Sequence, residues 1–250
     1  MEHSITRIRH ELKRRLITVK DATYITPNML RIVFTGQDLA DFDSPAPDDH
    51  VKLFFPVATG EYEGRDYTPR DFNATAQTLT IDFATHEGLH EPGPATSWAM
   101  NAKPGDEVQI GGPRGSTIIS PSFDWWLMIG DETALPAISR WLETLPATAK
   151  VKAIISVVSP TDEQQLTTKA QAEIIWLHRP TTQAADPTLL LNLLEAQELP
   201  QGDGFVWIAA EGLVARAAKD YLVNTRGHPL AWTKSSGYWL KGAENAHDKG

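Results

Sequence analysis

The chain has 250 residues, of which 41% are hydrophobic and 22% charged, and its formal net charge is −9. This balance is typical of globular proteins and excludes collagen-like, low-complexity and charge-rich disordered chains. The negative charge argues against a general nucleic-acid binder. Because the sequence has no cysteine, it offers no disulfide, thiolate metal site or catalytic thiol, so any redox chemistry must be carried by a bound cofactor.

No apolar run approaches the roughly 20 residues of a membrane helix, and the start of the chain lacks the apolar core of a secretory signal. Together with the lack of disulfides, this leads us to expect a cytoplasmic protein that binds neither membranes nor nucleic acid. We also expect a monomer. Residues 1–20 hold six Lys/Arg against two Glu. This predicts a solvated basic arm, with a basic rim that attracts an anionic ligand as the alternative.

The first 120 residues predict short strands. Runs of β-branched and aromatic residues are separated by Pro, Gly, Asp and Asn, and one short helix is expected over 95–102, after Pro94. This spacing is typical of a small antiparallel barrel or sandwich. The predicted strands cover residues 16–20, 29–35, 51–56, 78–85 and 107–112.

From about Asp124, predicted strands and helices alternate, which indicates a parallel sheet with helices on both faces. We expect a β-domain over residues 1–121 and a nucleotide-type α/β domain over 122–250. The strands are expected at 124–130, 152–159, 173–178 and 204–210, and the helices at 132–145, 162–171, 189–196 and 214–224.

Residues 65–70, RDYTPR, alternate a cation, an aromatic ring and a hydroxyl on what the pattern predicts to be one strand. Alternation would place Arg65, Tyr67 and Pro69 on one face and Thr68 and Arg70 on the other. An exposed strand with ordinary Arg and Tyr side chains is the alternative interpretation.

Two further segments favour anions. Residues 93–99 place Thr96 and Ser97 at a helix start, where backbone N–H groups attract negative charge. Residues 111–116 form a tight loop with one cation, Arg114. Together with residues 65–70 in a β-domain that precedes a dinucleotide-type domain, they suggest a flavin site facing a nicotinamide site.

Residues 130–136, GDETALP, join the first strand of the second domain to a helix, the usual place for a pyrophosphate. Of the dinucleotide fingerprint, however, only Gly130 is present. Because Asp131 and Glu132 would repel phosphate, we predict that their carboxylates cap the helix.

Residues 86–90, HEGLH, fit the zinc-protease pattern HExxH, which needs both histidines on one continuous helix. Gly88 and the Pro-Gly-Pro at 92–94 disfavour such a helix. No metal site is predicted.

In their order, these segments resemble the siderophore-interacting proteins, FAD-dependent ferric-siderophore reductases of the ferredoxin–NADP reductase superfamily. The resemblance implies an FAD-binding Greek-key barrel followed by an NAD(P)H-binding domain. It also implies transfer of electrons through FAD to a ferric siderophore, with release of iron(II). The matching segments span nearly the whole chain: 48–56, 65–70, 81–86, 93–116, 130–138, 209–212 and 237–242.

The resemblance also implies site residues by position. Arg65 would neutralise the FAD pyrophosphate, and Tyr67 and Thr68 would be catalytic, stacking on the isoalloxazine and hydrogen-bonding near its N5. In the second domain, the nicotinamide dinucleotide would lie against Asp131, Thr133, Ala134 and Glu211. The FAD site would be completed by Asp66, Asp82, His86, Gly93, Pro94, Ala95, Thr96 and Ser97.

Cations are expected at the mouth of the flavin site because ferric siderophores are often anionic. The candidates are Lys52, Arg70, Arg114 and Lys241, with solvated surface charge as the alternative for each. Arg179, which follows the strand 173–178, is the candidate for the 2′-phosphate of NADPH, since its planar guanidinium can bind two phosphate oxygens.

Several alternatives stay open. The turn at 130–136 lacks the glycines of a tight dinucleotide site, which leaves a ferredoxin as a donor besides NADPH or NADH. The protein could be a general NAD(P)H–flavin oxidoreductase without an iron role. It could instead carry a ferric siderophore without turnover, but the segment 65–70 disfavours a carrier, which needs no flavin.

Overall fold

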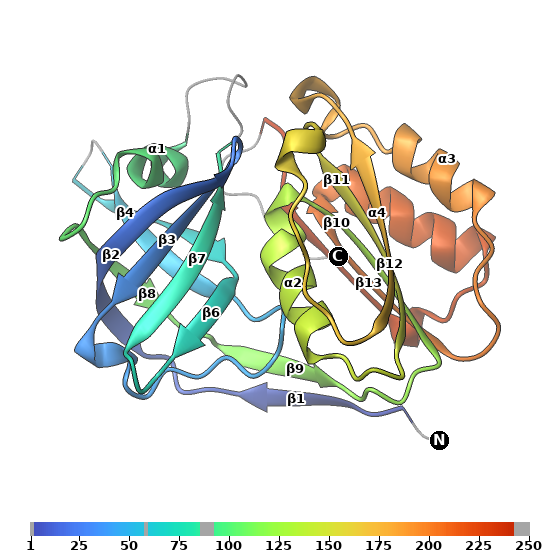
Figure 1. Ribbon diagram of the computed structural model, residues 1–250, viewed down its shortest axis with the longest axis horizontal. Helices are drawn as coiled ribbons and strands as arrows, with labels where there is room; N and C mark the ends of the chain where they lie inside the picture. Colours follow the sequence, from blue (N-terminus) through green and yellow to red (C-terminus); the bar gives the residue numbers. More distant parts are fainter. Residues whose placement is uncertain (1–2, 58–59, 86–92, 243–250) are drawn as a thin grey trace. The chain divides into compact units, whose positions relative to one another are not determined.

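The computed structural model describes residues 3–57, 60–85 and 93–242 (Figure 1). The chain divides into two compact units: residues up to Ser120 together with Ser139–Trp141, and Pro121–Ile138 together with the residues from Leu142 onward. The main boundary lies one residue before the predicted one. His86 and the HEGLH segment lie outside the described residues.

The first unit is built on a seven-stranded sheet with the order β5-β4-β8-β2-β3-β7-β6. Its neighbouring strands are all antiparallel. The sheet curls into a half-barrel (Figure 1), which confirms the predicted antiparallel β-domain. Its strands are β2 (Arg14–Thr26), β3 (Met29–Thr35), β4 (Val51–Pro56), β5 (Tyr62–Tyr67), β6 (Pro69–Asn73), β7 (Thr78–Ala84) and β8 (Glu107–Gly111).

The core of this unit follows from strand alternation, since every second side chain of a strand faces inward. In β4, Val51, Leu53 and Phe55 are fully buried, while the side chains between them are partly exposed. Helix α1 (Pro94–Asn101) packs on the same core through Ala95 and Ala99. A separate two-stranded ribbon pairs β1 (Ile5–Arg9) with β9 (Gly115–Ile119), and a 3-10 turn, η1, covers Gln37–Leu39.

The second unit holds a five-stranded sheet with the order β12-β11-β10-β13-β14, and all its neighbours are parallel. This confirms the predicted parallel sheet. The strands are β10 (Trp125–Asp131), β11 (Lys150–Val157), β12 (Gln171–His178), β13 (Gly204–Glu211) and β14 (Thr233–Trp239). The helical elements are η2 (Glu132–Ala134), α2 (Leu135–Thr144), η3 (Pro160–Asp162), η4 (Thr181–Gln183), α3 (Thr188–Ala196), α4 (Gly212–Asp220), a π turn (Tyr221–Thr225) and η6 (Leu230–Trp232).

Helices cover both faces of this sheet, as predicted. Helices α3 and α4 pack with Trp125, Leu127 and Ile129 of β10. The opposite face carries Gly130, where an added Cβ would lie 2.6 Å from the Ala134 Cβ and 2.8 Å from Ile138. Gly130 therefore serves the close approach of η2 and α2 to the sheet.

Two local predictions are wrong. Residues 163–170 form no helix; the short turn η3 is followed by irregular chain up to β12. Residues 65–70 are not one strand, because β5 ends at Tyr67 and β6 begins at Pro69. Strand β14 and the ribbon β1–β9 were not anticipated. Among the described residues, no helix has the length and hydropathy to cross a membrane.

Candidate functional site

Strand β5 sorts its charged residues to two faces. In the β4–β5 register, Arg65 lies opposite the fully buried Leu53, whereas Asp66 lies opposite Lys52. Arg65 therefore lies on the core side of the ribbon and Asp66 on the other. Arg65 donates to the Glu63 carboxylate at 2.7 Å and to the Gly64 carbonyl at 3.2 Å. These contacts fix a guanidinium beside Tyr67, two residues further along the same face.

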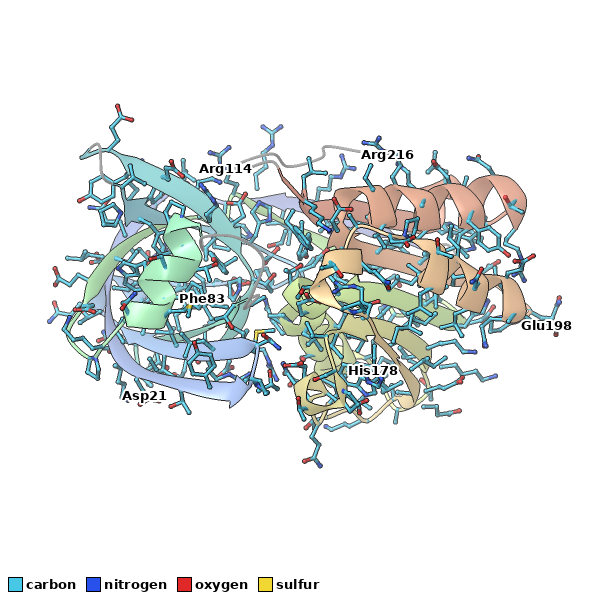
Figure 2. All side chains as sticks on the ribbon, turned by 90° about the horizontal axis from the view of Figure 1, so that it is seen from above. Asp21, Phe83, Arg114, His178, Glu198 and Arg216 are labelled. Carbon is cyan, nitrogen blue, oxygen red and sulfur yellow. The ribbon has the colours of Figure 1, made fainter. Side chains whose placement is uncertain are left out.

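Tyr67 is an aromatic group anchored by the core. Its ring centroid lies 4.5 Å from that of Phe83 and 6.3 Å from that of Phe55. Figure 2 shows Phe83 inside the curled sheet. Burial raises the pKa of the Tyr67 phenol well above its ordinary value, and the Arg65 cation opposes this only in part. Tyr67 is therefore a neutral, rigidly held aromatic ring at any physiological pH.

Thr68 is the single residue between β5 and β6, and it is buried. Since the strand breaks there, the predicted alternation does not continue to Pro69, which pairs with Ile81 on β7. Arg70 follows on β6 and is partly buried. The break places Thr68 directly after the aromatic ring of Tyr67, at the end of β5.

Asp82 makes a cross-strand ion pair. Its two carboxylate oxygens accept from Arg31 Nε and a terminal nitrogen of the same guanidinium, both at 2.7 Å, and the two residues are direct partners in the β3–β7 register. A paired, two-point contact of this kind is geometrically specific. In this fold Asp82 joins β3 to β7, and its role at a cofactor stays a prediction.

Helix α1 starts with the features of an anion site. Its N-cap, Gly93, contributes no side-chain hydrogen bond, and Pro94 occupies the first turn. The first intrahelical bond of this turn runs from the Ser97 N–H to the Gly93 carbonyl. The N–H groups of Ala95 and Thr96 precede that bond, so they are the donors that a helix start offers to an anion.

These groups fit a flavin dinucleotide. Arg65 supplies a cation for a pyrophosphate, Tyr67 an aromatic ring, and the first turn of α1 backbone donors including those of Ala95 and Thr96. All of them belong to the antiparallel unit. All of these residues were predicted from the sequence.

Lys52, a predicted substrate cation, has its charge paired. Its Nζ lies 2.7 Å from the Asp66 carboxylate. Its stem crosses Gly64, where an added Cβ would lie 2.6 Å from Lys52 Cδ. Arg114 lies in the loop between β8 and β9 and is exposed (Figure 2). Lys52 thus lies on the face of the β4–β5 strand pair opposite Arg65.

In the parallel unit, Asp131 ties three segments together at the carboxyl end of β10. One of its oxygens accepts from the Thr133 N–H at 2.9 Å, and the other from the Glu211 N–H at 2.8 Å and from Trp239 Nε1 at 2.9 Å. The predicted cap by Asp131 is confirmed. Burial, and then the neighbouring Glu132, raises the pKa of Asp131, while Arg179 and these donors oppose the rise.

Glu211 caps helix α4 with its carboxylate, as Asp131 caps η2. Its carboxylate accepts from the Leu213 and Val214 N–H groups at 2.7 and 3.3 Å, and from the Lys241 N–H at 3.2 Å. The helix starts at the carboxyl ends of β10 and β13 therefore already hold carboxylates of this chain. Contacts of Asp131, Thr133, Ala134 and Glu211 with a dinucleotide stay predictions.

Arg179 and Glu132 form a buried ion pair, 2.9 Å between Arg179 Nη2 and the carboxylate, with side-chain exposures of only 7% and 4%. Glu132 thus pairs with Arg179 and is not a helix cap, contrary to expectation. The other terminal nitrogen of Arg179 is buried without a hydrogen-bond partner among the described residues. This environment favours a structural role for Arg179, and its predicted contact with NADPH is untested.

Sequence reasoning missed the polar contacts of the C-terminal segment. Trp239 and Lys241 meet Asp131 and Glu211 although more than 25 residues separate each pair in sequence. The Lys241 ammonium donates to the Thr182 carbonyl at 2.5 Å. The only signal in the sequence was Trp239 in the GYW segment. A buried indole N–H usually has a hydrogen-bond acceptor, so such a residue indicates a polar partner without identifying it.

Comparison with known protein families identifies the family of this chain. Residues 18–64 and 61–117 match the siderophore-interacting FAD-binding domain, and residues 123–242 match the siderophore-interacting protein family. The chain belongs to this family. The FAD-binding match includes β5 and the first turn of α1, where the cation, the aromatic ring and the helix donors lie.

Named relatives of this siderophore-interacting protein include reductases. It is 35% identical over 231 residues to an NADPH-dependent ferric-chelate reductase of Escherichia coli, covering 84% of this chain and 87% of that one. It is 33% identical to the ferric vibriobactin reductase ViuB of Vibrio cholerae, covering 75% and 74%. The crystal structure of a siderophore utilization protein from T. fusca aligns with this chain with a TM-score of 0.88 at 37% identity. The alignment covers 97% of this chain and 98% of that one.

More distant structures share the fold alone. The cytochrome b5 reductase domain of Ulva prolifera nitrate reductase aligns with a TM-score of 0.68 at 14% identity, covering 88% of this chain and 96% of that one. A ferredoxin-NADP+ reductase from Plasmodium falciparum aligns with a TM-score of 0.60 at 11% identity, covering 88% and 95%. These likenesses confirm the predicted two-domain fold of the superfamily.

Proposed function

We propose that this protein is an FAD-dependent reductase of ferric siderophores that takes its electrons from NADPH. The observation that carries the proposal is the group formed by Arg65, Tyr67 and the first turn of α1, which lies within the matched FAD-binding domain. The names of the Escherichia coli and Vibrio cholerae relatives support the ferric-chelate reaction.

When bound, the flavin supplies the conversion between hydride transfer from a nicotinamide and single-electron transfer to iron(III). The protein's residues bind and orient it. Arg65 neutralises the pyrophosphate together with the N–H donors of Ala95 and Thr96. The Tyr67 ring, fixed by Phe55 and Phe83, supports the isoalloxazine, and the Thr68 hydroxyl donates or accepts near N5.

The ferric siderophore is the substrate, and its negative charge is met by Lys52, Arg70, Arg114 and Lys241. Reduction to iron(II) weakens the chelate, because oxygen-rich ligands prefer the harder iron(III), so the metal is released. No permanent metal ligand from the protein is needed. We place the reaction in the cytoplasm and the protein as a monomer, with NADPH preferred to NADH and a ferredoxin as the alternative donor.

A direct experiment tests this function. The purified protein should show the flavin absorbance at about 450 nm and release FAD on denaturation. With NADPH it should reduce a ferric siderophore faster than a quinone or free flavin. A colourless protein that binds a ferric siderophore would indicate a carrier, and equal rates with quinones would indicate a general flavin oxidoreductase. If a ferredoxin but not NADPH reduces the bound flavin, the electron donor is a ferredoxin.

A further inference from the structure

A pocket of about 190 Å³ lies at the C-terminal end of α3 in the parallel unit. Its apolar wall includes Trp125 and Leu127 of β10, Ile154 of β11, and Leu194 and Leu199 on the helix side. An apolar cavity of about 150 Å³ can bind a molecule of the size of benzene. This pocket therefore has room for a compact ring system.

The pocket exists because α3 is shorter than the strands that it covers. Helix α3 has nine residues, about 13 Å at ~1.5 Å per residue, whereas β11 has eight residues, about 26 Å at ~3.3 Å per residue. The helix ends at Ala196, and irregular chain follows it. Residues 197–200 line the gap that remains beside the amino ends of β10 and β11 without filling it.

This pocket is separate from the predicted dinucleotide site of the same unit. Strand β10 begins at Trp125, which lines the pocket, and ends at Asp131. The two residues are therefore about 20 Å apart at ~3.3 Å per residue. Dinucleotides bind open parallel sheets at the carboxyl ends of the strands, whereas this pocket lies at the amino ends. It is a second site on the sheet.

Trp125 is a rigid part of the wall. Its indole N–H donates to the Gly202 carbonyl at 3.2 Å, and its ring centroid lies 5.5 Å from that of His228. Gly204 provides space for the ring, because an added Cβ there would overlap the indole. An aromatic ring that is fixed in this way can contact a planar ligand at little entropic cost.

Two donors stand side by side on the sheet at the rim of the pocket. Lys150 and Gln171 are direct partners in the β11–β12 register, and both line the pocket. Neighbouring strands are about 4.8 Å apart, so the ammonium and the amide can donate to the same anion. Lys150 is exposed, and its ammonium has no ion pair or hydrogen bond within the part of the chain that the structure describes.

The other charged residues of the rim leave Lys150 available for an anion. Lys152 donates to the Gln197 amide oxygen at 2.5 Å and lies 3.2 Å from the Glu173 carboxylate, which it neutralises. Glu198 comes from the exposed chain after α3 and not from the sheet (Figure 2). The pocket thus combines an apolar interior that contains an indole with a cation and an amide at one side of its mouth.

We propose that this pocket binds a compact aromatic carboxylate of one or two rings. The ring lies against Trp125 and Leu127, and the carboxylate accepts from Lys150 and Gln171. The inference goes beyond the proposed function and does not depend on it, since the pocket shares no residue with the flavin, dinucleotide or siderophore contacts assigned above.

The test uses 2-naphthoate and its neutral analogue 2-naphthamide as probes. Each is titrated into the purified, isotope-labelled protein while the indole N–H signals are followed by NMR, and the signal that disappears in Trp125→Phe is that of Trp125. We expect 2-naphthoate to shift this signal until the site is saturated. Lys150→Gln should weaken 2-naphthoate by about threefold to fivefold, as loss of an ion pair near the surface does, and leave 2-naphthamide unchanged. Lys20→Gln, at an exposed lysine of β2 in the other unit, is the matched control and should change neither.

Two blocking variants test the place of binding. Leu199→Trp fills the pocket from the helix side, and Gln171→Trp fills it from an exposed position on the edge strand β12. Each should abolish the shift of the Trp125 signal with both probes. Thermal unfolding of each variant is measured beside binding, and Gln171→Trp decides if Leu199→Trp unfolds.

Two results would overturn the site itself: a Trp125 signal that 2-naphthoate does not shift in the wild type, or undiminished binding in a folded blocking variant. If Lys150→Gln changes the affinities for both probes equally, or changes neither, the assignment of the carboxylate to Lys150 is wrong.

Discussion

At the residue scale, the antiparallel unit fixes its charged groups before any ligand arrives. Arg65 is held by Glu63 and Gly64, and Lys52 by Asp66, on opposite faces of the β4–β5 strand pair. Because alternation of a strand separates these faces, a change at Arg65 should affect flavin binding without affecting Lys52. Each cation can therefore be tested on its own.

Arg65→Ala should weaken FAD binding by a factor of about 30 or more, corresponding to the roughly 2–5 kcal/mol lost when a buried or half-buried charge loses its partner. The measurement is the FAD dissociation constant of the flavin-free protein. Arg216→Ala, an exposed cation of α4 in the parallel unit, serves as the control. Full FAD occupancy in purified Arg65→Ala would contradict the assignment of the pyrophosphate to Arg65.

The Arg179–Glu132 pair yields a second prediction at this scale. Arg179→Ala leaves Glu132 buried without its partner, which typically costs about 3–5 kcal/mol. The double variant Glu132→Gln/Arg179→Met should recover much of that loss, because it leaves no unpaired charge. The free energy of unfolding of the wild type and of both variants is measured by urea denaturation.

The same variants separate the two roles of Arg179. If it also grips the 2′-phosphate, Arg179→Ala lowers kcat/KM for NADPH by about tenfold or more and leaves NADH nearly unchanged. A purely structural pair changes both donors equally. An undiminished stability of Arg179→Ala would contradict the buried pair.

At the scale of elements, β14 is joined to the turn after β10 through the Trp239–Asp131 hydrogen bond. Trp239→Phe removes the indole donor and should destabilise the fold by about 1–3 kcal/mol, the usual cost when a buried polar group loses a hydrogen-bond partner. Chemical unfolding of both proteins measures this difference.

The effect should depend on pH with a defined sign. Burial raises the folded-state pKa of Asp131 above its ordinary value, so the folded state binds the proton more tightly than the unfolded state. Stability therefore falls as pH rises from about 4 through the raised pKa. Because Trp239 favours the charged carboxylate, Trp239→Phe should raise that pKa further and extend the fall in stability to higher pH. Parallel pH profiles of the two proteins would contradict this.

Much of the architecture was predictable from local pattern, and the failures have local causes. The strand 29–35 and the strand 51–56 match β3 and β4 residue for residue, because alternation of apolar side chains reports a half-buried strand directly. Residues 163–170 have a polar composition that suits a surface helix, yet Leu166 and Ala170 are their only apolar residues. Without an apolar face, a helix gains little from tertiary packing.

The candidate site, too, was predictable from the sequence only in part. The cation, the aromatic ring and the helix start were found because they lie within short segments, at 65–68 and 93–97. Other charged groups have partners across the sheet or far along the chain, as Asp82 has in Arg31 and Asp131 in Trp239. Sequence spacing predicted the cap by Asp131 but carries no record of these long-range contacts, so the Arg179–Glu132 ion pair and the contacts of Trp239 and Lys241 could be seen only in three dimensions.

At the scale of the whole molecule, the net charge of −9 sets the background for an anionic substrate. A ferric siderophore with negative charge approaches a protein that repels it on average, so local cations must supply the attraction. Lys52 and Lys241 are the two candidates whose ammonium groups have defined partners, Asp66 and the Thr182 carbonyl. A substrate anion would compete with the Asp66 carboxylate for Lys52, and it could bind Lys241 in addition to the Thr182 carbonyl.

Lys52→Ala and Lys241→Ala should each raise KM for an anionic ferric siderophore several-fold, with FAD content unchanged. Lys169→Ala, an exposed lysine before β12, is the matched control and should leave KM unchanged. Added salt should raise the wild-type KM in the same direction, because exposed charges are screened over about 8–10 Å at physiological ionic strength. In the two variants this salt dependence should be weaker, since part of the screened attraction is already gone. A neutral ferric chelate should be insensitive to both the substitutions and the salt. A wild-type KM that ignores salt, together with an unchanged KM in both variants, would show that neither lysine meets the substrate.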